Sequence, residues 1–419
     1  MLDIDRRFAP PTVSINQFPV KEAQKDETFS NLNVFFVHSE IQPVCRIEWI
    51  FDAGMMYHNN PAVPFLTAKL ISEGTKNFTA LNIQEKIAFE GAFFEVSVTP
   101  DKVIFTLHAM NKTLSNLTAL LTEVFTLPVF SVQEIEQQKK VSIQQLRINE
   151  KKTAFVASRE FRKSLFGESH PLAVTYDENS LNAASQNELK TFFEQHYKHC
   201  EIIVSGSYDM HVKQFIKQWS VGVELSGLKQ LKTVENNHQP HSLLINKDDA
   251  VQTSVRFGFT TISRNHSDWN KLRVANEILG GYFGSRLMKN IREDKGWTYG
   301  VHSQIQSSVL GSFWVIGTDV KKEHRESCLD EIQFEIQKLI QEGVSDDELE
   351  SVINYMKGSF VSGLNTPFAL ADKFKTIHFS GLDYTYYQDF LTVLNTITSF
   401  EIQSCVEKYF TEHINVLVG

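Results

Sequence analysis

The segment LNAASQNELKTFFEQHYKHCEIIVSG, residues 181–206, has a gapless counterpart in LNTITSFEIQSCVEKYFTEHINVLVG, residues 394–419. Few positions are identical, but the two patterns agree throughout. Each segment begins with polar residues suited to a helix N-terminus, continues as an amphipathic helix, and ends in a short apolar strand closed by Gly. This agreement over 26 residues predicts that one structural unit occurs twice in the chain.

Other segments repeat in the same order at nearly the same offset. Residues 130–146 and 344–360 both begin with Ser and acidic residues and continue as a long helical pattern. Residues 93–110 predict two strands around a Pro-Asp turn, and residues 299–320 predict two strands around a Gly-containing turn. We therefore expect two similar α+β halves, 1–228 and 229–419, which join within a polar, weakly patterned stretch.

Composition restricts the possible functions. The 419 residues predict two to three domains, and a net charge of −9 gives no basic footprint for nucleic acid or an anionic membrane. The cysteines contain no Cys-x-x-Cys pair, which favours buried thiols in a reducing compartment. The first thirty residues lack a signal-peptide core, and no run reaches the roughly 18 apolar residues of a membrane helix. If Met1 is the natural start, a cytoplasmic location is expected.

Three landmarks extend the pattern: IEWIFDAGMMYHNN at 47–60, VPFLTAKLISEGTKN at 63–77 and GGYFGSRLMKNIREDKGWTYGVHS at 280–303. Together with the duplication, they resemble the insulinase/pitrilysin (inverzincin) family of zinc peptidases. That family includes the mitochondrial processing peptidase and bacterial two-subunit members. The resemblance spans about residue 30 to residue 419. It implies an α+β fold of two homologous halves, each a mostly antiparallel sheet with helices packed on one face, forming half of a clam-shell chamber.

The zinc motif of the family is degenerate in this chain. Active members carry H-x-x-E-H on a helix, where two His at i and i+4 bind Zn²⁺ and the Glu activates water, and a later Glu completes the ligand set. By this resemblance the motif positions fall on Phe65, Ala68 and Lys69, and the third ligand falls on Gln145 or, one residue earlier, on Gln144. Phe, Ala, protonated Lys and a Gln amide do not replace these ligands. We expect no catalytic residue and no bound metal in this chain.

Two other clusters contain residue types that bind metals. His196, His199 and Cys200 lie at a helix-to-strand junction, and His238 and His241 lie in the expected linker. Neither cluster has matched ligands on a second element, as a catalytic zinc site requires. A solvated helix end with one buried thiol, and surface histidines, are the simpler interpretations.

The segment IREDKGWTYG, residues 291–300, places Arg292 and Tyr299 on either side of a Gly-containing turn between a helix and a strand. In the family that this chain resembles, an Arg and a Tyr at this spacing hold the substrate backbone near the zinc of the opposite half. A guanidinium fork and a phenol suit peptide carbonyls. The pair also has a purely structural interpretation, as a helix-terminal Arg and a strand Tyr. Arg286 and Lys295 are expected to stabilise helix and turn.

The strand expected at 92–99 corresponds to the edge strand on which peptides add in the family. Addition of a peptide strand needs an exposed edge and little side-chain specificity, so it does not depend on the metal. The pattern leaves open whether Phe93 and Phe94 lie in the core.

The resemblance implies a non-catalytic subunit of a heterodimeric zinc metallopeptidase, which contributes Arg292 and Tyr299 to peptide binding. Its partner is expected to be a homologous active subunit that carries the zinc, or a second copy of this chain, with no role for nucleic acid or membrane. The alternative is a structural or assembly protein of the processing-peptidase type that has no role in proteolysis. An enzyme with different chemistry is the third possibility, although no nucleophile and base stand in a recognisable setting.

Overall fold

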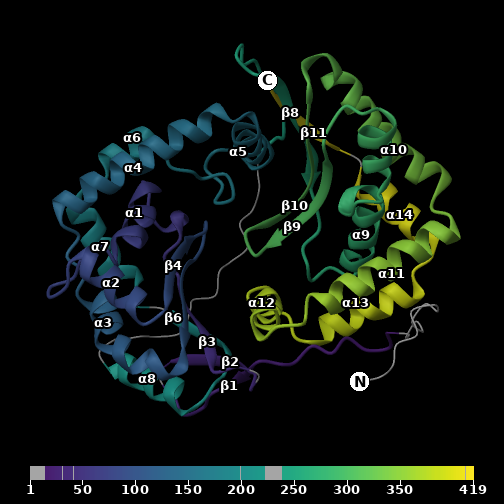
Figure 1. Cartoon of the computed structure of the whole chain (residues 1–419). Coiled ribbons are helices and arrows are strands. Elements are labelled where there is room, and N and C mark those ends of the chain that lie inside the picture. Colours follow the sequence, from purple (N-terminus) through teal and green to yellow (C-terminus); the bar gives the residue numbers. More distant parts are fainter. Residues whose placement is uncertain (1–14, 31, 41, 199, 222–237, 411) are drawn as a thin grey trace.

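A computed structural model of the chain describes residues 15–30, 32–40, 42–198, 200–221, 238–410 and 412–419. They form two α+β halves that lie side by side, the N-terminal half in purple to teal and the C-terminal half in green to yellow (Figure 1). The boundary expected between residues 228 and 229 lies outside the described residues.

The sheet of the N-terminal half contains six strands in the described part of the chain, and β2 with β6 forms its parallel pair. Its helices pack on one face through a shared apolar core. In spatial order the strands are β1 (Gln24–Lys25), β2 (Asn33–His38), β6 (Cys200–Gly206), β3 (Val44–Phe51), β5 (Val103–Met110) and β4 (Phe93–Val98). The helices are α1 (Ala62–Leu70), α2 (Ala80–Phe89), α3 (Leu114–Thr126), α4 (Val132–Lys151), α6 (Glu178–Ala183), α7 (Gln186–His196) and α8 (Met210–Val221), with 3₁₀ turns η1 (Met55–Tyr57) and η2 (Asn111–Thr113).

The sheet of the C-terminal half has five strands among the described residues, and β7 with β11 is its parallel pair. In spatial order the strands are β7 (Leu243–Ile245), β11 (Ile414–Val418), β8 (Gln252–Thr260), β10 (Gly311–Lys321) and β9 (Val301–Ser308). The helices on its outer face are α9 (Trp269–Asn276), α10 (Arg325–Glu342), α11 (Asp346–Ser362), α13 (Thr385–Thr396) and α14 (Ser399–Tyr409), with π-helical segments η3 (Glu277–Gly281) and η4 (Met288–Asp294) and the 3₁₀ turn η5 (Lys322–His324).

The predicted duplication is confirmed down to the helix caps. Helix α7 begins with a capping box between Ser185 and Glu188, and α14 begins with the same box between Thr398 and Glu401. In each box the N-cap hydroxyl accepts a hydrogen bond from a backbone N–H, and the Glu carboxylate accepts one from the N-cap N–H. The long helices α4 and α11 both follow a Ser N-cap, and β4 and β9 occupy the edges of their sheets.

Each half also contributes one helix to the other half, which the sequence did not predict. Helix α5 (Thr153–Phe166) belongs to the N-terminal half but lies on the second sheet, where Phe161 packs against Phe313. Helix α12 (Pro367–His378) belongs to the C-terminal half but lies on the first sheet, where Phe374 packs with Ile50 and Ile203. Both sheets therefore have helices on one face, as expected, and one exchanged helix on the other (Figure 1).

A buried ionic network attaches α12 to the first sheet. Arg46 on β3 donates to Asp372 at 2.8 Å and lies 3.0 Å from Glu48, and Lys375 donates to Glu48 at 2.5 Å. Burial would raise the pKa of Asp372, but hydrogen bonds from Arg46 and Lys375 outweigh it and hold that pKa below its usual value. The two halves are thus joined by charge as well as by apolar contact.

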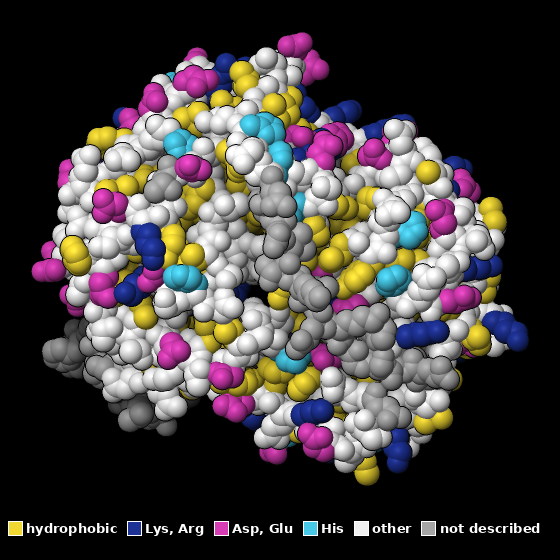
Figure 2. All heavy atoms as spheres, turned by 180° about the vertical axis from the view of Figure 1, so that it is seen from behind, with side chains coloured by type: hydrophobic (Ala, Val, Ile, Leu, Met, Phe, Trp, Pro, Cys, Tyr) yellow, Lys and Arg dark blue, Asp and Glu magenta, His cyan; other side chains and the backbone are white. Residues whose placement is uncertain are grey.

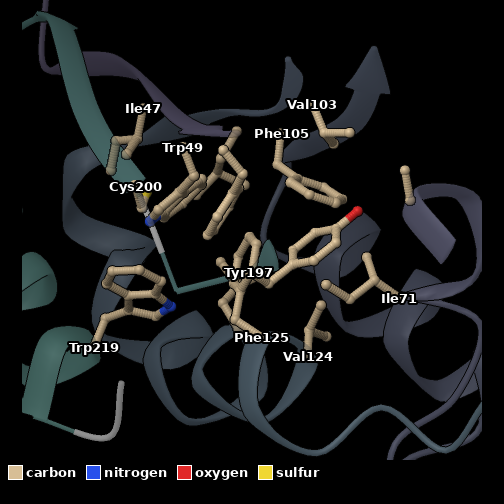
Figure 3. Packing of buried hydrophobic residues seen from close by; sticks show 14 of the residues in the cluster. Ile47, Trp49, Ile71, Val103, Phe105, Val124, Phe125, Tyr197, Cys200 and Trp219 are labelled. Carbon is tan, nitrogen blue, oxygen red and sulfur yellow. The ribbon is translucent and has the colours of Figure 1, made fainter. Parts of the chain in front are cut away.

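Aromatic side chains fill the core of the N-terminal half (Figure 3). The rings of Trp49 and Trp219 lie 5.6 Å apart, and Phe125 packs against both. Phe105 and Tyr197 close the cluster towards α1, and Tyr197 is buried. Because such large rings pack in one arrangement, this core fixes where α1 and α4 stand relative to the sheet.

On the face drawn in Figure 2, acidic and basic side chains are interspersed and do not gather in one basic patch. Within the described ranges we find no helix with the length and apolar character needed to span a bilayer.

Candidate functional site

The three motif positions on α1 are occupied by side chains with structural contacts. Phe65 stacks on Tyr176 with ring centroids 4.2 Å apart, and Ala68 is completely buried in the core. The Lys69 ammonium extends towards β4 and lies 3.5 Å from the carbonyl oxygen of Val96. An aromatic stack and a cation therefore stand where a zinc site would need neutral imidazoles. Sequence reasoning did not identify Tyr176, which follows no motif.

The third ligand position lies on α4, which packs beside α1. Gln145 and Gln144 are both exposed, and the Gln145 amide donates to the Asn149 side chain at 3.2 Å. Across the described ranges no group of three or more His, Cys, Asp or Glu side chains is placed to hold a metal ion. Helices α1 and α4 are in contact, but the residues at the expected ligand positions on them do not fit a zinc ion.

The described members of the two histidine clusters belong to no metal-binding group of three or more ligands. His196 stacks on Phe192 with ring centroids 4.3 Å apart, and Cys200 is buried so completely that its thiol pKa is raised well above the usual value. His199 lies outside the described residues. The rings of His238 and His241 lie 5.7 Å apart in an edge contact at the surface.

The turn that carries the predicted Arg–Tyr pair is well defined. The helix ends in η4, and Gly296 adopts a φ of +65°, a conformation that favours glycine. Strand β9 begins only at Val301, because its ladder with β10 starts at the pair Val301 and Thr318. Tyr299 therefore precedes the strand by two residues, whereas the sequence had placed it in the first residues of the strand.

The two side chains lie at one exposed corner. The Arg292 Nε donates to the carbonyl oxygen of Tyr299 at 3.1 Å, and its guanidinium lies 4.6 Å over the ring of Phe283. The Tyr299 side chain is 95% exposed, and its hydroxyl group makes no hydrogen bond within the described part of the chain. Arg292 thus fixes the backbone of the turn, while Tyr299 projects its phenol into solvent.

The neighbouring basic residues have structural partners, as the sequence predicted. Arg286 makes a bidentate pair with Glu348 at 2.9 and 2.7 Å, and Lys295 lies 2.7 Å from Glu331. These pairs attach the turn to α11 and α10. Arg292, by contrast, has one carboxylate within ion-pair distance in the described chain, that of the adjacent Glu293 at 3.7 Å.

The two edge strands frame the space between the halves. Strand β4 lies at the edge of the first sheet in the described chain, with Phe93 60% exposed and Phe94 packed against the core. Strand β9 lies at the edge of the second sheet, and Tyr299 stands at the rim of a pocket beside it. This pocket was not predictable from the sequence, because α5 supplies its wall from the other half.

The described residues thus form two sheets with exchanged helices, a helix pair whose expected motif positions hold no zinc ligand, and an exposed Arg–Tyr turn. Comparison with known families shows the class of protein to which these features belong. Residues 33–171 match the insulinase (peptidase family M16) model, and residues 183–356 match the peptidase M16 inactive domain. The chain belongs to the insulinase family, M16.

Similar proteins carry both active and inactive descriptions. The uncharacterized zinc protease YmxG of Bacillus subtilis is 22% identical over 70% of this chain and 72% of its own length. The non-peptidase homolog YmxG of Helicobacter pylori is 23% identical over 78% and 77%. A solved peptidase M16 inactive domain from Pseudomonas fluorescens superposes with a TM-score of 0.84 at 22% identity, covering 95% of this chain and 98% of that one. This last likeness supports the fold alone.

Proposed function

We propose that this chain is a non-catalytic subunit of a two-chain zinc peptidase and that it holds peptide substrate through Arg292 and Tyr299. The active partner, a homologous chain with an intact H-x-x-E-H motif, would carry the zinc and the water-activating Glu. A second copy of this chain is the alternative partner for the same surface. Alone, the chain would bind peptide without cleaving it.

The exposed phenol of Tyr299 is the observation that carries this proposal. Its neighbours Arg286 and Lys295 are committed to ion pairs, whereas the Tyr299 side chain is exposed and its hydroxyl makes no hydrogen bond to a described residue. The Arg292 guanidinium holds the turn through one nitrogen, and its remaining N–H groups are able to donate to a peptide carbonyl. Because Gly296 and the Arg292 bond fix the turn, the backbone that carries the phenol needs little ordering when it binds.

The test is to purify the chain with the most similar H-x-x-E-H protein of the same genome, and to assay zinc content and peptide cleavage for each chain and for the mixture. Arg292→Ala and Tyr299→Phe are expected to lower kcat/KM of the mixture by about 100-fold, the usual effect of removing one oxyanion-stabilising donor. Thermal stability should not change with Tyr299→Phe, because that side chain is 95% exposed.

Tyr355→Phe is the matched control, since Tyr355 is a partly exposed tyrosine on α11 away from the turn. Unchanged activity in both Arg292→Ala and Tyr299→Phe would reject the substrate-binding role. If the two chains still copurify in that case, the assembly function becomes the better account. Zinc bound tightly and stoichiometrically by this chain alone would contradict the metal-free part of the proposal.

We also propose a reducing, cytoplasmic setting. All four cysteines are free and buried, and burial raises the pKa of the Cys45, Cys328 and Cys405 thiols to about 12. Such thiols do not form thiolates at neutral pH and are unreactive. Fractionation of the producing cells with an antibody against the chain tests the location, and recovery outside the cytoplasmic fraction would reject it.

A further inference from the structure

A pocket of about 550 Å³ lies beside Tyr299, between α5 and the second sheet. Ser158 and Arg162 on α5 form one wall, and residues of β8, β9 and β10 form the floor. Tyr299 and Gly300 stand at the rim. The pocket exists because α5 crosses from the other half and covers only part of this face of the sheet.

Positive charge exceeds negative charge on the walls of this pocket. Arg162 is half-buried and makes no hydrogen bond or ion pair with any described residue. Burial, together with the nearby Arg159, lowers the pKa of Arg162. A guanidinium taken partly out of water without an anion is costly, whereas Arg46 and Arg286 each have carboxylate partners.

The second cation of the pocket, Arg256 on β8, is attracted by Asp319, but its hydrogen bonds to described residues all go to neutral acceptors. It donates to the Ser158 hydroxyl at 3.0 Å and to the carbonyl oxygens of Val255 and Ala154 at 2.9 and 3.3 Å. Asp319 is the one acidic residue in the lining, and its carboxylate accepts a hydrogen bond from Ser254. Two guanidiniums thus face one carboxylate, which leaves the pocket one negative charge short.

We propose that this pocket binds a carboxylate of the peptide that Tyr299 holds at its rim. The carboxylate comes either from an Asp or Glu side chain or from the C-terminus of the peptide. The inference rests on the proposed function and adds to it a substrate class: peptides with a carboxylate near the residue that contacts Tyr299.

The chemistry of the lining fits this ligand. The Arg162 guanidinium offers a planar fork of donors that matches a carboxylate, and an incoming anion would supply the partner that the fold does not provide. Gln304 and Gln306 on β9 add neutral hydrogen-bonding groups, and Phe313 and Val315 on β10 add apolar surface for the methylene groups of an acidic side chain. A small inorganic anion would not use that apolar surface.

The test measures binding of short fluorescent peptides to the full chain by anisotropy. One peptide carries a single Glu, a second carries Gln at that position, and each is made with a free and with an amidated C-terminus. We expect the peptide with the recognised carboxylate to bind about tenfold more tightly than its neutral isostere. A preference for Glu assigns the side chain, and a preference for the free terminus assigns the terminal carboxylate.

Arg162→Gln should abolish this preference without weakening binding of the neutral peptide, and Arg162→Lys should restore part of it. Loss of folding is not expected, because Arg162 has no partner to lose in the described chain. Arg325→Gln is the control, since Arg325 pairs with Glu326 at 3.2 Å and does not line the pocket.

The outcomes separate this inference from the proposed function. If the wild-type chain binds charged and neutral peptides equally, or if Arg162→Gln keeps the preference, the carboxylate pocket is wrong while peptide binding stands. If no peptide binds, a thermal-shift titration with N-acetylglutamate against N-acetylglutamine decides the matter. A shift with the acid alone that Arg162→Gln removes supports the pocket and rejects the peptide-binding function. No shift rejects both.

Discussion

Replacing Glu48 by Gln is expected to destabilise the contact between the two halves. The Glu48 side chain on β3 is 4% exposed and interacts with two cations, Lys375 at 2.5 Å and Arg46 at 3.0 Å. Gln preserves the shape of the side chain but removes its charge. The substitution therefore leaves two largely buried cations with less compensation than the fold provides.

The size of this destabilisation depends on which anionic partners the two cations keep. Removing one partner of a buried ion pair costs about 3–5 kcal/mol. Asp372 stays 2.8 Å from Arg46 and 2.9 Å from Lys375, so neither cation is left alone. Because Asp372 is 54% exposed, solvent weakens that compensation without removing it. We expect a loss near the lower limit, about 3 kcal/mol.

Urea denaturation at neutral pH measures this loss as a lower midpoint with an unchanged slope. Glu85→Gln, an exposed substitution on α2, should stay within about 0.5 kcal/mol of wild type. Adding Lys375→Met to Glu48→Gln should recover part of the loss, because it removes one of the uncompensated cations. A cost below about 1 kcal/mol, or strict additivity in the double variant, would show that the network is not coupled in this way.

Three further substitutions have distinct signatures. Burial and the neighbouring Glu134 raise the pKa of Glu73, so the stability that Glu73 contributes is present below its usual pKa and is lost as pH rises. Glu73→Gln should therefore raise the urea midpoint at pH 7 but not near pH 4. A higher midpoint at both pH values would reject this pH dependence. Phe374→Ala should lower the free energy of unfolding by about 3–5 kcal/mol, because Phe374 is buried between α12 and the first sheet. Replacement of the exposed Phe93 by Ala should lower it by less than about 1 kcal/mol. Equal losses would contradict the packing of the exchanged helix. Gly206→Ala should lower the free energy of unfolding by at least about 2 kcal/mol. The reason is that Gly206 has a φ of +108° and the new methyl carbon would lie 2.3 Å from a backbone carbonyl oxygen of β3. A melting curve identical to that of the wild type would refute this prediction.

The duplicated elements were predictable because their signals are local. A Ser or Thr followed three residues later by Glu marks a helix start wherever it occurs, and Ser185 and Thr398 both form the box that their sequence predicts. The paired strands around their turns follow from alternation and turn residues in the same way. The empty zinc motif was likewise readable, since a ligand set is defined by residue type and spacing.

The exchanged helices and the pocket were not predictable from one sequence. An amphipathic pattern in α5 shows that one face is buried, but it does not show which of two similar sheets buries that face. The stack of Phe65 on Tyr176 joins residues that no shared motif connects. That Arg162 has no anionic partner among the described residues becomes visible only in three dimensions, because a half-buried Arg usually has a partner.

The residues at the expected zinc-motif positions and those of the Arg–Tyr turn differ in how much they contribute to stability. Phe65 and Ala68, at the expected zinc-motif positions, contribute to packing, so replacing them would alter stability. Tyr299 contributes almost nothing to packing, since its side chain is 95% exposed. A loss of binding in Tyr299→Phe therefore cannot be attributed to misfolding. Arg162 is half-buried, so exposure does not give the same assurance for Arg162→Gln. There, unchanged binding of the neutral peptide is the folding control, and it separates an effect on the proposed carboxylate site from an effect on stability.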